Sequence, residues 1–119
     1  MSSNGTYNGY SSYETWLVAI WIDNDQNSID HWVDIAKYHY DIAKDTKYFT
    51  KKEEAIISFS DDMKEWYSGS VGDKVGDKDE ISGLFSDLLH AALVSVDWHE
   101  LAGKYMDQYL ESVTEKEGV

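Results

Sequence analysis

The sequence predicts an all-α fold, a compact bundle of four or five helices around one aromatic-rich core. Apolar side chains recur along most of the chain at the intervals of amphipathic helices. Capping-box spacings, with a Ser, Thr or Asp three residues before a Glu, open three of the expected helices. The chain has no Pro to interrupt a helix, and no two segments have the turn residues of a β-hairpin. With 119 residues it forms one domain, which we place at residues 11–113.

The first helix is expected from about Ser12 to Ile22, after a flexible lead-in over residues 1–10. The lead-in is rich in Ser, Asn, Gly and Tyr and has no apolar period. Ser11 and Glu14 have the spacing of an N-cap and its capping-box partner. An unbroken apolar run follows, from Trp16 to Ile22. Because such a run also suits a buried strand, a strand is the alternative for this segment.

Two further helices are expected after a polar turn over residues 23–28. Residues 29–44 follow an amphipathic pattern, and Thr50 with Glu53 forms the second capping box. The inner face of the helix that begins there is expected to carry Ile56, Phe59, Met63 and Trp66. Residues 68–78 contain three Gly, which predicts a loop and the most mobile internal segment.

The last two helices are expected over residues 79–94 and from Asp97 to about Val113. The inner face of the first should carry Ile81, Leu84, Phe85, Leu88 and Ala92. Asp97 caps the second, with Glu100 three residues later, and residues 114–119 should fray. Core packing is the expected role of the five tryptophans, Trp16, Trp21, Trp32, Trp66 and Trp98.

The charge of the chain excludes several classes of function. Asp and Glu number 23 against 10 basic residues, all of them Lys, which gives a formal net charge of −13. Without Arg or a basic surface, direct binding of nucleic acid is not expected, and an anionic membrane would repel the chain. No apolar run approaches the roughly 18 residues of a membrane span, and no secretory signal is visible. We therefore expect a soluble protein in the cytoplasm of a host cell.

Catalytic and metal-binding patterns are missing from the sequence. The chain has no Cys, which excludes thiol catalysis, disulfides and Cys-based metal sites. Its four His form no zinc motif. The alternation of Asp23, Asp25 and Asn27 resembles the start of a calcium loop, but Ser28 occupies the position that requires Gly. We therefore expect no enzyme, no metal and no cofactor, and interpret this segment as a turn that caps the next helix.

Two of the expected helices carry a stripe of carboxylates opposite their apolar face. At about 100° per residue, the acids of each stripe fall within a sector of roughly 60–80°. The predicted partner-binding residues are Asp30, Asp34, Asp41 and Asp45 on one helix and Glu100, Asp107, Glu111 and Glu115 on the other. Steps of four and seven residues separate carboxylates by about 6 and 10.5 Å along the axis, a spacing of the kind that a DNA backbone presents. A solvated face, partly neutralised by nearby Lys, is the ordinary alternative.

Three segments carry specific signatures. Tyr-Glu-Thr-Trp occurs at residues 13–16, Gly-Leu-Phe-Ser-Asp-Leu-Leu-His-Ala-Ala-Leu at residues 83–93, and Val-Asp-Trp-His-Glu-Leu-Ala at residues 96–102. Together they resemble a family of small acidic proteins of phages, plasmids and prokaryotic genomes. The family brings no established activity to individual residues. The resemblance implies a mobile-element context, in which small acidic proteins are often inhibitors that compete with DNA for host nucleases.

Two functions from different classes follow from these features. The first is a DNA-competitive inhibitor that docks its acidic helices onto a basic host protein, a nucleic-acid-binding nuclease or effector complex of the CRISPR or restriction type. The alternative is a small helical adaptor or oligomerising protein whose acidity serves solubility, and an enzyme with an unrecognised site is a third. A net charge of −13 exceeds the magnitude of about 2–8 that suits solubility, which favours a basic partner or a saline environment. A homodimer is left open.

Overall fold

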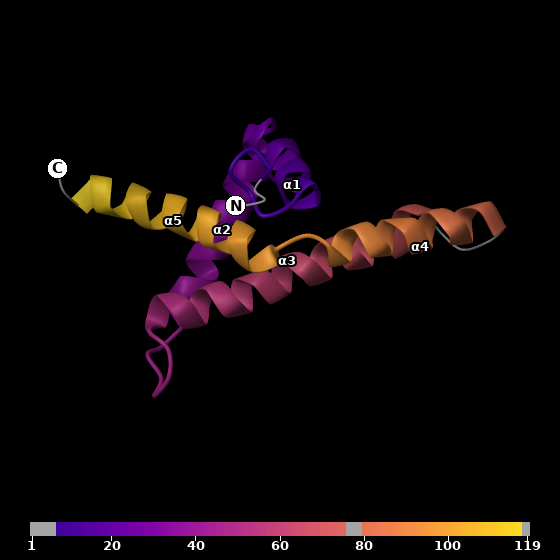
Figure 1. Cartoon of the computed structure of the whole chain (residues 1–119). Coiled ribbons are helices and arrows are strands. Elements are labelled where there is room, and N and C mark those ends of the chain that lie inside the picture. Colours follow the sequence, from indigo (N-terminus) through magenta and orange to yellow (C-terminus); the bar gives the residue numbers. More distant parts are fainter. Residues whose placement is uncertain (1–6, 76–79, 118–119) are drawn as a thin grey trace.

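Five helices and their short connections make up the structure, a computed structural model that describes residues 7–75 and 80–117. The helices are α1 (Tyr13–Asp23), α2 (Gln26–Ile42), α3 (Lys51–Val75), α4 (Glu80–Val94) and α5 (Trp98–Glu117). Figure 1 shows α2 and α5 packed against the first half of α3, with α1 lying on α2 and α5. The second half of α3 extends away from them with α4 at its side, and we call this pair the α3–α4 arm. The all-α prediction, with five helices around one aromatic core, is confirmed.

The first helix begins one residue later than the predicted capping box. Ser12, rather than Ser11, is the N-cap of α1, and its hydroxyl accepts a hydrogen bond from the Thr15 amide at 3.1 Å. Ser11 instead donates its amide and hydroxyl to the Glu100 carboxylate, at 3.2 and 2.8 Å. The helix itself, rather than the alternative strand, is confirmed.

Part of the predicted lead-in forms a tight turn. Tyr7 and Tyr10 exchange backbone hydrogen bonds of 2.6 and 2.9 Å around Asn8 and Gly9, which both have positive φ. A two-residue turn of this kind suits Asn-Gly because both central residues must adopt a left-handed conformation. Residues 1–6 lie outside the described part of the chain.

Two helices are longer than predicted. α3 continues to Val75 through Gly69 and Gly72, so the predicted loop over residues 68–78 is wrong as far as Val75. Although each Gly costs about 1 kcal/mol in a helix interior, α4 packs along this part of α3, and tertiary packing outweighs propensity. Residues 76–79 are not described. α5 runs to Glu117, beyond the expected end near Val113.

The predicted inner face of α4 faces largely outward. Leu84 and Leu88 are each more than half exposed, and Ala92 is also exposed. The reason is the position of α4, which packs beside α3 on the arm rather than between the central helices (Figure 1). The side chains of Ile81 and Phe85 lie outside the described residues.

The core is aromatic, but it does not contain all the predicted tryptophans. Trp32 and Trp98 are buried, and Tyr67 stacks on both, with ring centroids 5.9 and 5.3 Å apart. The exposed fraction is 73% for Trp21 and 51% for Trp66, so their predicted burial is wrong. The apolar run of α1 covers its whole circumference, yet the buried residues of α1 are Thr15, Ala19 and Ile22, which share one side.

A partly exposed polar cluster around the buried Tyr105 joins the lead-in, α1 and α5. The Tyr105 hydroxyl donates to one oxygen of Asp23 at 2.9 Å, and the Lys104 ammonium donates to the other oxygen. Lys104 also donates to the Tyr10 hydroxyl at 2.8 Å. Burial alone would lower the pKa of Lys104, but the hydrogen bonds to Asp23 and Tyr10 raise it. The cluster therefore fixes Tyr10, at the end of the lead-in, to α1 and α5.

Alkaline titration should find the hydroxyls of Tyr67 and Tyr105 resistant to ionisation while the protein is folded. Burial raises the pKa of Tyr67 and Tyr105, and the hydrogen bond to Asp23 adds to the rise at Tyr105. Because the fold holds both hydroxyls neutral, their stabilising effect is complete below the unfolded pKa of about 10 and is lost as pH rises towards the folded pKa. Phenolate absorbance should show two late ionisations that coincide with loss of the helical circular dichroism.

The Tyr105→Phe variant is the control for this titration, because it should remove one phenolate from the late step alone. Complete ionisation of all phenolates before any helix is lost would contradict the burial of these two rings.

Candidate interaction surface

The α2 carboxylates predicted to bind a partner lie on the exposed side of that helix, and they differ in their surroundings. Asp30 accepts a hydrogen bond from the Gln26 amide group at 3.0 Å. Asp34 is exposed and makes no hydrogen bond or ion pair with the described residues. Asp41 pairs with the Lys37 ammonium at 2.6 Å, and this hydrogen bond raises the pKa of Lys37. All three carboxylates can therefore be reached from solvent, and Asp34 is the most open.

Asp45 does not belong to the stripe. Because α2 ends at Ile42 and Ala43 has extended backbone angles, Asp45 lies off the helix. Its carboxylate accepts the Lys51 amide at 2.6 Å, at the start of α3. The Lys51 ammonium in turn donates to the Ala43 carbonyl at 2.8 Å. These contacts join the end of α2 to the start of α3, so Asp45 has a structural contact that the sequence pattern did not reveal.

The α5 carboxylates are also unequal. Glu100 is held by Ser11, as described above. Asp107 pairs with Lys52 of α3 at 2.9 Å, and Glu111 is exposed beside this pair in a hollow of about 380 Å³. The side chain of Glu115 lies outside the described residues. Glu111 is therefore the open member of this stripe.

The two remaining predicted capping boxes both form, one of them in part. Thr50 and Glu53 exchange hydrogen bonds of 2.9 and 3.1 Å. Asp97 accepts the Glu100 amide at 3.0 Å, but its own amide donates to the Thr15 hydroxyl at 2.8 Å rather than to Glu100. The Glu100 carboxylate therefore does not bind the Asp97 amide and accepts hydrogen bonds from Ser11 instead.

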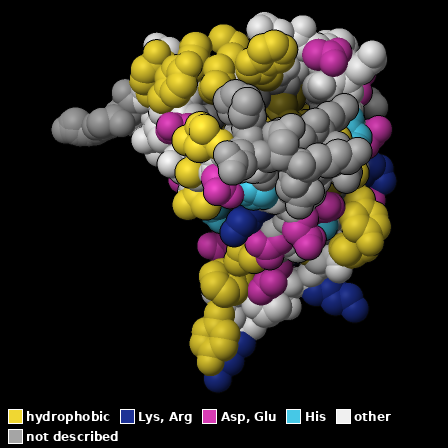
Figure 2. Space-filling model, turned by 90° about the vertical axis from the view of Figure 1, so that its right-hand side faces the viewer, with side chains coloured by type: hydrophobic (Ala, Val, Ile, Leu, Met, Phe, Trp, Pro, Cys, Tyr) yellow, Lys and Arg dark blue, Asp and Glu magenta, His cyan; other side chains and the backbone are white. Residues whose placement is uncertain are grey.

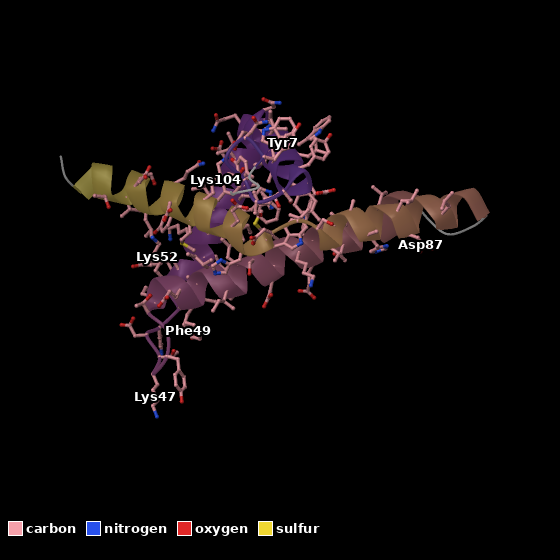
Figure 3. The ribbon with its side chains drawn as sticks, in the orientation of Figure 1. Tyr7, Lys47, Phe49, Lys52, Asp87 and Lys104 are labelled. Atoms are coloured by element: carbon pink, nitrogen blue, oxygen red, sulfur yellow. The ribbon has the colours of Figure 1, made fainter. Side chains whose placement is uncertain are left out.

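Acidic side chains are concentrated on one part of the surface. Figure 2 shows acidic side chains gathered across the middle of one face and hydrophobic side chains along its upper edge. Figure 3 shows Lys47 at the tip of the loop between α2 and α3, Phe49 near the base of this loop, and Asp87 on the arm.

A hydrogen-bond network around the buried His39 joins α2 to α3, and the sequence analysis did not predict it. The two ring nitrogens of His39 lie 2.9 Å from the Ser58 hydroxyl and 2.9 Å from the Asp62 carboxylate, and the ring stacks on Phe59. Ser58 also donates to the Ala55 carbonyl at 3.2 Å. The sequence feature that could have predicted the burial of His39 is its spacing, because Trp32, Ala36 and His39 follow the i, i+4, i+7 pattern of buried residues on α2. We interpret this Ser-His-Asp contact as a link between helices.

Trp21 and Trp66, both predicted to lie in the core, instead border a hollow of about 340 Å³ between α1, α2 and α3. Its lining includes Trp21, Ile22, Asp25, Ser28, Trp66 and Tyr67, and we call it the aromatic cleft. A second hollow of about 230 Å³ continues along Trp21 and Tyr67 towards Leu17 and Val18. The cleft is of a size that takes small ligands or side chains, for which sites of about 300–1,000 Å³ are usual.

The chain belongs to a family of unknown function, DUF7249, whose family model matches residues 3–102. The match extends from the lead-in to the first turns of α5 and assigns an activity to none of these residues. No curated protein and no solved structure matches the chain. Within residues 7–75 and 80–117, no helix combines the length and the apolar character needed to cross a membrane.

Proposed function

We propose that this protein is an acidic inhibitor from a mobile genetic element that binds the nucleic-acid-binding surface of a host defence complex, of the CRISPR or restriction type, and competes with DNA. The observation that carries the proposal is the set of exposed carboxylates on α2 and α5, led by Asp34 and Glu111. They belong to a chain with a net charge of −13 and no Arg. The mobile-element context rests on the sequence resemblance described above.

The α2 carboxylates suit a basic surface that normally binds a phosphate backbone. Asp30, Asp34 and Asp41 are separated by about 6 and 10.5 Å along the helix axis. The pair between Lys37 and Asp41 is exposed, and exposed ion pairs are weak, so a cation of the partner can replace Lys37. Charges of this kind accelerate association and orient the two proteins, while desolvated aromatic side chains usually supply most of the affinity.

A helical adaptor is the second candidate. The observation that favours it is the exposed apolar side of α4, with Leu84 and Leu88 on the arm. Such a face could bind a partner through apolar burial, and the acidity would then serve solubility alone. The two candidates differ in how binding responds to salt.

A competition assay tests the proposal. With labelled duplex DNA and a nuclease complex of the host, the protein should raise the apparent DNA dissociation constant in proportion to its concentration, and excess DNA should relieve the effect. The effect should weaken at high salt, because the screening length falls from about 10 Å at 0.1 M to about 3 Å at 1 M. Inhibition that excess DNA does not relieve, or no inhibition of any nuclease complex of the host, would reject the proposal. Partner binding that is insensitive to salt would favour the adaptor.

A further inference from the structure

The aromatic cleft exposes large apolar rings where three helices meet. Trp21 projects from the end of α1 with 73% of its surface exposed, and Trp66 of α3 is about half exposed. Tryptophan is among the residues that most often dominate binding energy at protein interfaces. Two exposed tryptophans bordering one hollow therefore indicate a binding site rather than incomplete packing.

The cleft has a rigid inner wall. The Trp66 ring lies 5.7 Å from Trp32 and 4.8 Å from Tyr67, in edge-to-face contacts. Tyr67 in turn stacks on the buried Trp98 at 5.3 Å. Because these rings already pack on the core, a ligand that stacks on Trp66 need not order the wall first, and preorganisation of this kind favours binding.

Asp25 supplies a negative charge at the cleft. Its two oxygens accept hydrogen bonds from the backbone N–H of Asn27 at 3.1 Å and from the Ser28 hydroxyl at 3.2 Å. A carboxylate has about four acceptor positions, so each oxygen can accept a further donor. The full negative charge of this carboxylate exceeds the positive charge of roughly one half that the helix dipole places at the N-terminus of α2. The cleft thus combines indole faces with a carboxylate, which suits a cation rather than an anion.

We propose that the aromatic cleft binds an arginine side chain of a basic protein partner. A guanidinium group is planar, stacks on indole faces and donates two parallel hydrogen bonds to a carboxylate. A partner with exposed arginines is complementary to a net charge of −13, whereas a second copy of this chain has no Arg to offer. The site is separate from the α2 and α5 stripes. The inference therefore goes beyond the proposed function and holds for any basic partner.

The test uses the isolated full-length protein and a peptide, acetyl-Gly-Arg-Gly-amide, at constant ionic strength. Its control is the same peptide with citrulline, the neutral isostere of arginine. Heteronuclear NMR resolves indole N–H groups, and the Trp21→Leu and Trp66→Phe variants assign two of the five. The arginine peptide should shift the Trp21 and Trp66 signals saturably, and the citrulline peptide should bind several-fold more weakly.

Two variants identify the parts of the site. Asp25→Asn keeps a residue that caps helices equally well and should weaken the arginine peptide about fivefold, as expected for loss of one exposed ion pair. Asp61→Asn, at an exposed position of α3 outside the cleft and outside both carboxylate stripes, is the matched control and should leave binding unchanged. Trp21→Leu keeps an apolar wall but removes the indole face, and should weaken the arginine peptide while leaving the citrulline peptide unaffected.

Three results would overturn the inference. Equal binding of both peptides would show a neutral apolar site, and shifts without saturation would show no site. Shifts of the Trp21 signal on dilution of the protein without peptide would show that a second copy covers the cleft. None of these results depends on nuclease inhibition, so failure here is distinguishable from failure of the competition assay.

Discussion

Replacement of Trp98 by alanine should lower the free energy of unfolding by about 3–5 kcal/mol. Trp98 is 7% exposed at the start of α5 and stacks on Tyr67, which stacks on Trp32. The substitution would remove the α5 ring from a three-ring stack that joins α2, α3 and α5, and would leave a cavity in its place. For a domain of this size the melting temperature should fall by roughly 10–20 °C, as measured by circular dichroism at the helical band. A loss of this size is a large part of the 5–15 kcal/mol that stabilises a typical protein.

Two further variants make the result specific. Trp21→Ala removes the same side chain from a position that is 73% exposed and should change stability by only about 0.5 kcal/mol. Trp98→Phe keeps a ring and removes an indole N–H that is buried without a hydrogen-bond partner in the described structure. Because an unsatisfied donor costs about 1–3 kcal/mol, this change should be much milder than Trp98→Ala. A melt of Trp98→Ala within a few degrees of wild type would contradict the burial of this ring.

The tryptophans show that the sequence predicted where the helices lie but not which of their side chains are buried. Periodicity and caps located all five helices, because both signals depend on neighbouring residues along one helix. Burial depends on which side of a helix meets another element. Trp21 lies in an apolar run that surrounds α1, so the pattern contained no information about the packed side. Leu84 and Leu88 form a regular stripe on α4, but no central helix covers it.

The candidate site shows the same limit. The stripe arithmetic correctly placed Asp30, Asp34 and Asp41 on the exposed side of α2, because that side depends on helix geometry alone. The same arithmetic did not predict that α2 ends before Asp45. It also did not predict the hydrogen bond between Glu100 and Ser11, which are 89 residues apart in the chain. His39 likewise obtains its partners from α3. Long-range contacts of this kind depend on the fold.

Reversal of Asp34 and Asp41 to lysine should weaken inhibition of a DNA-binding partner by at least about tenfold, with little loss of stability. Each reversal converts an attraction for a basic surface into a repulsion, and unfavourable charge contacts at an interface cost several kcal/mol; about 1.4 kcal/mol already corresponds to tenfold. Both positions are exposed, and exposed substitutions usually cost within about 0.5 kcal/mol. The new lysine at position 41 faces Lys37, a repulsion of a few tenths of a kcal/mol on a helix.

The matched control reverses Asp61 and Asp87, which makes the same change in net charge at exposed positions on α3 and on the arm (Figure 3). If the α2 carboxylates contact the partner, this control should inhibit nearly as well as the wild-type protein. Glu111→Lys tests the α5 side separately, and a silent result there would assign docking to α2 alone. Inhibition should be measured as DNA cleavage by the partner complex at two salt concentrations, since the difference between variants should shrink as salt screens their charges. Equal losses in the α2 variant and the control would show that net charge, rather than the α2 face, determines binding.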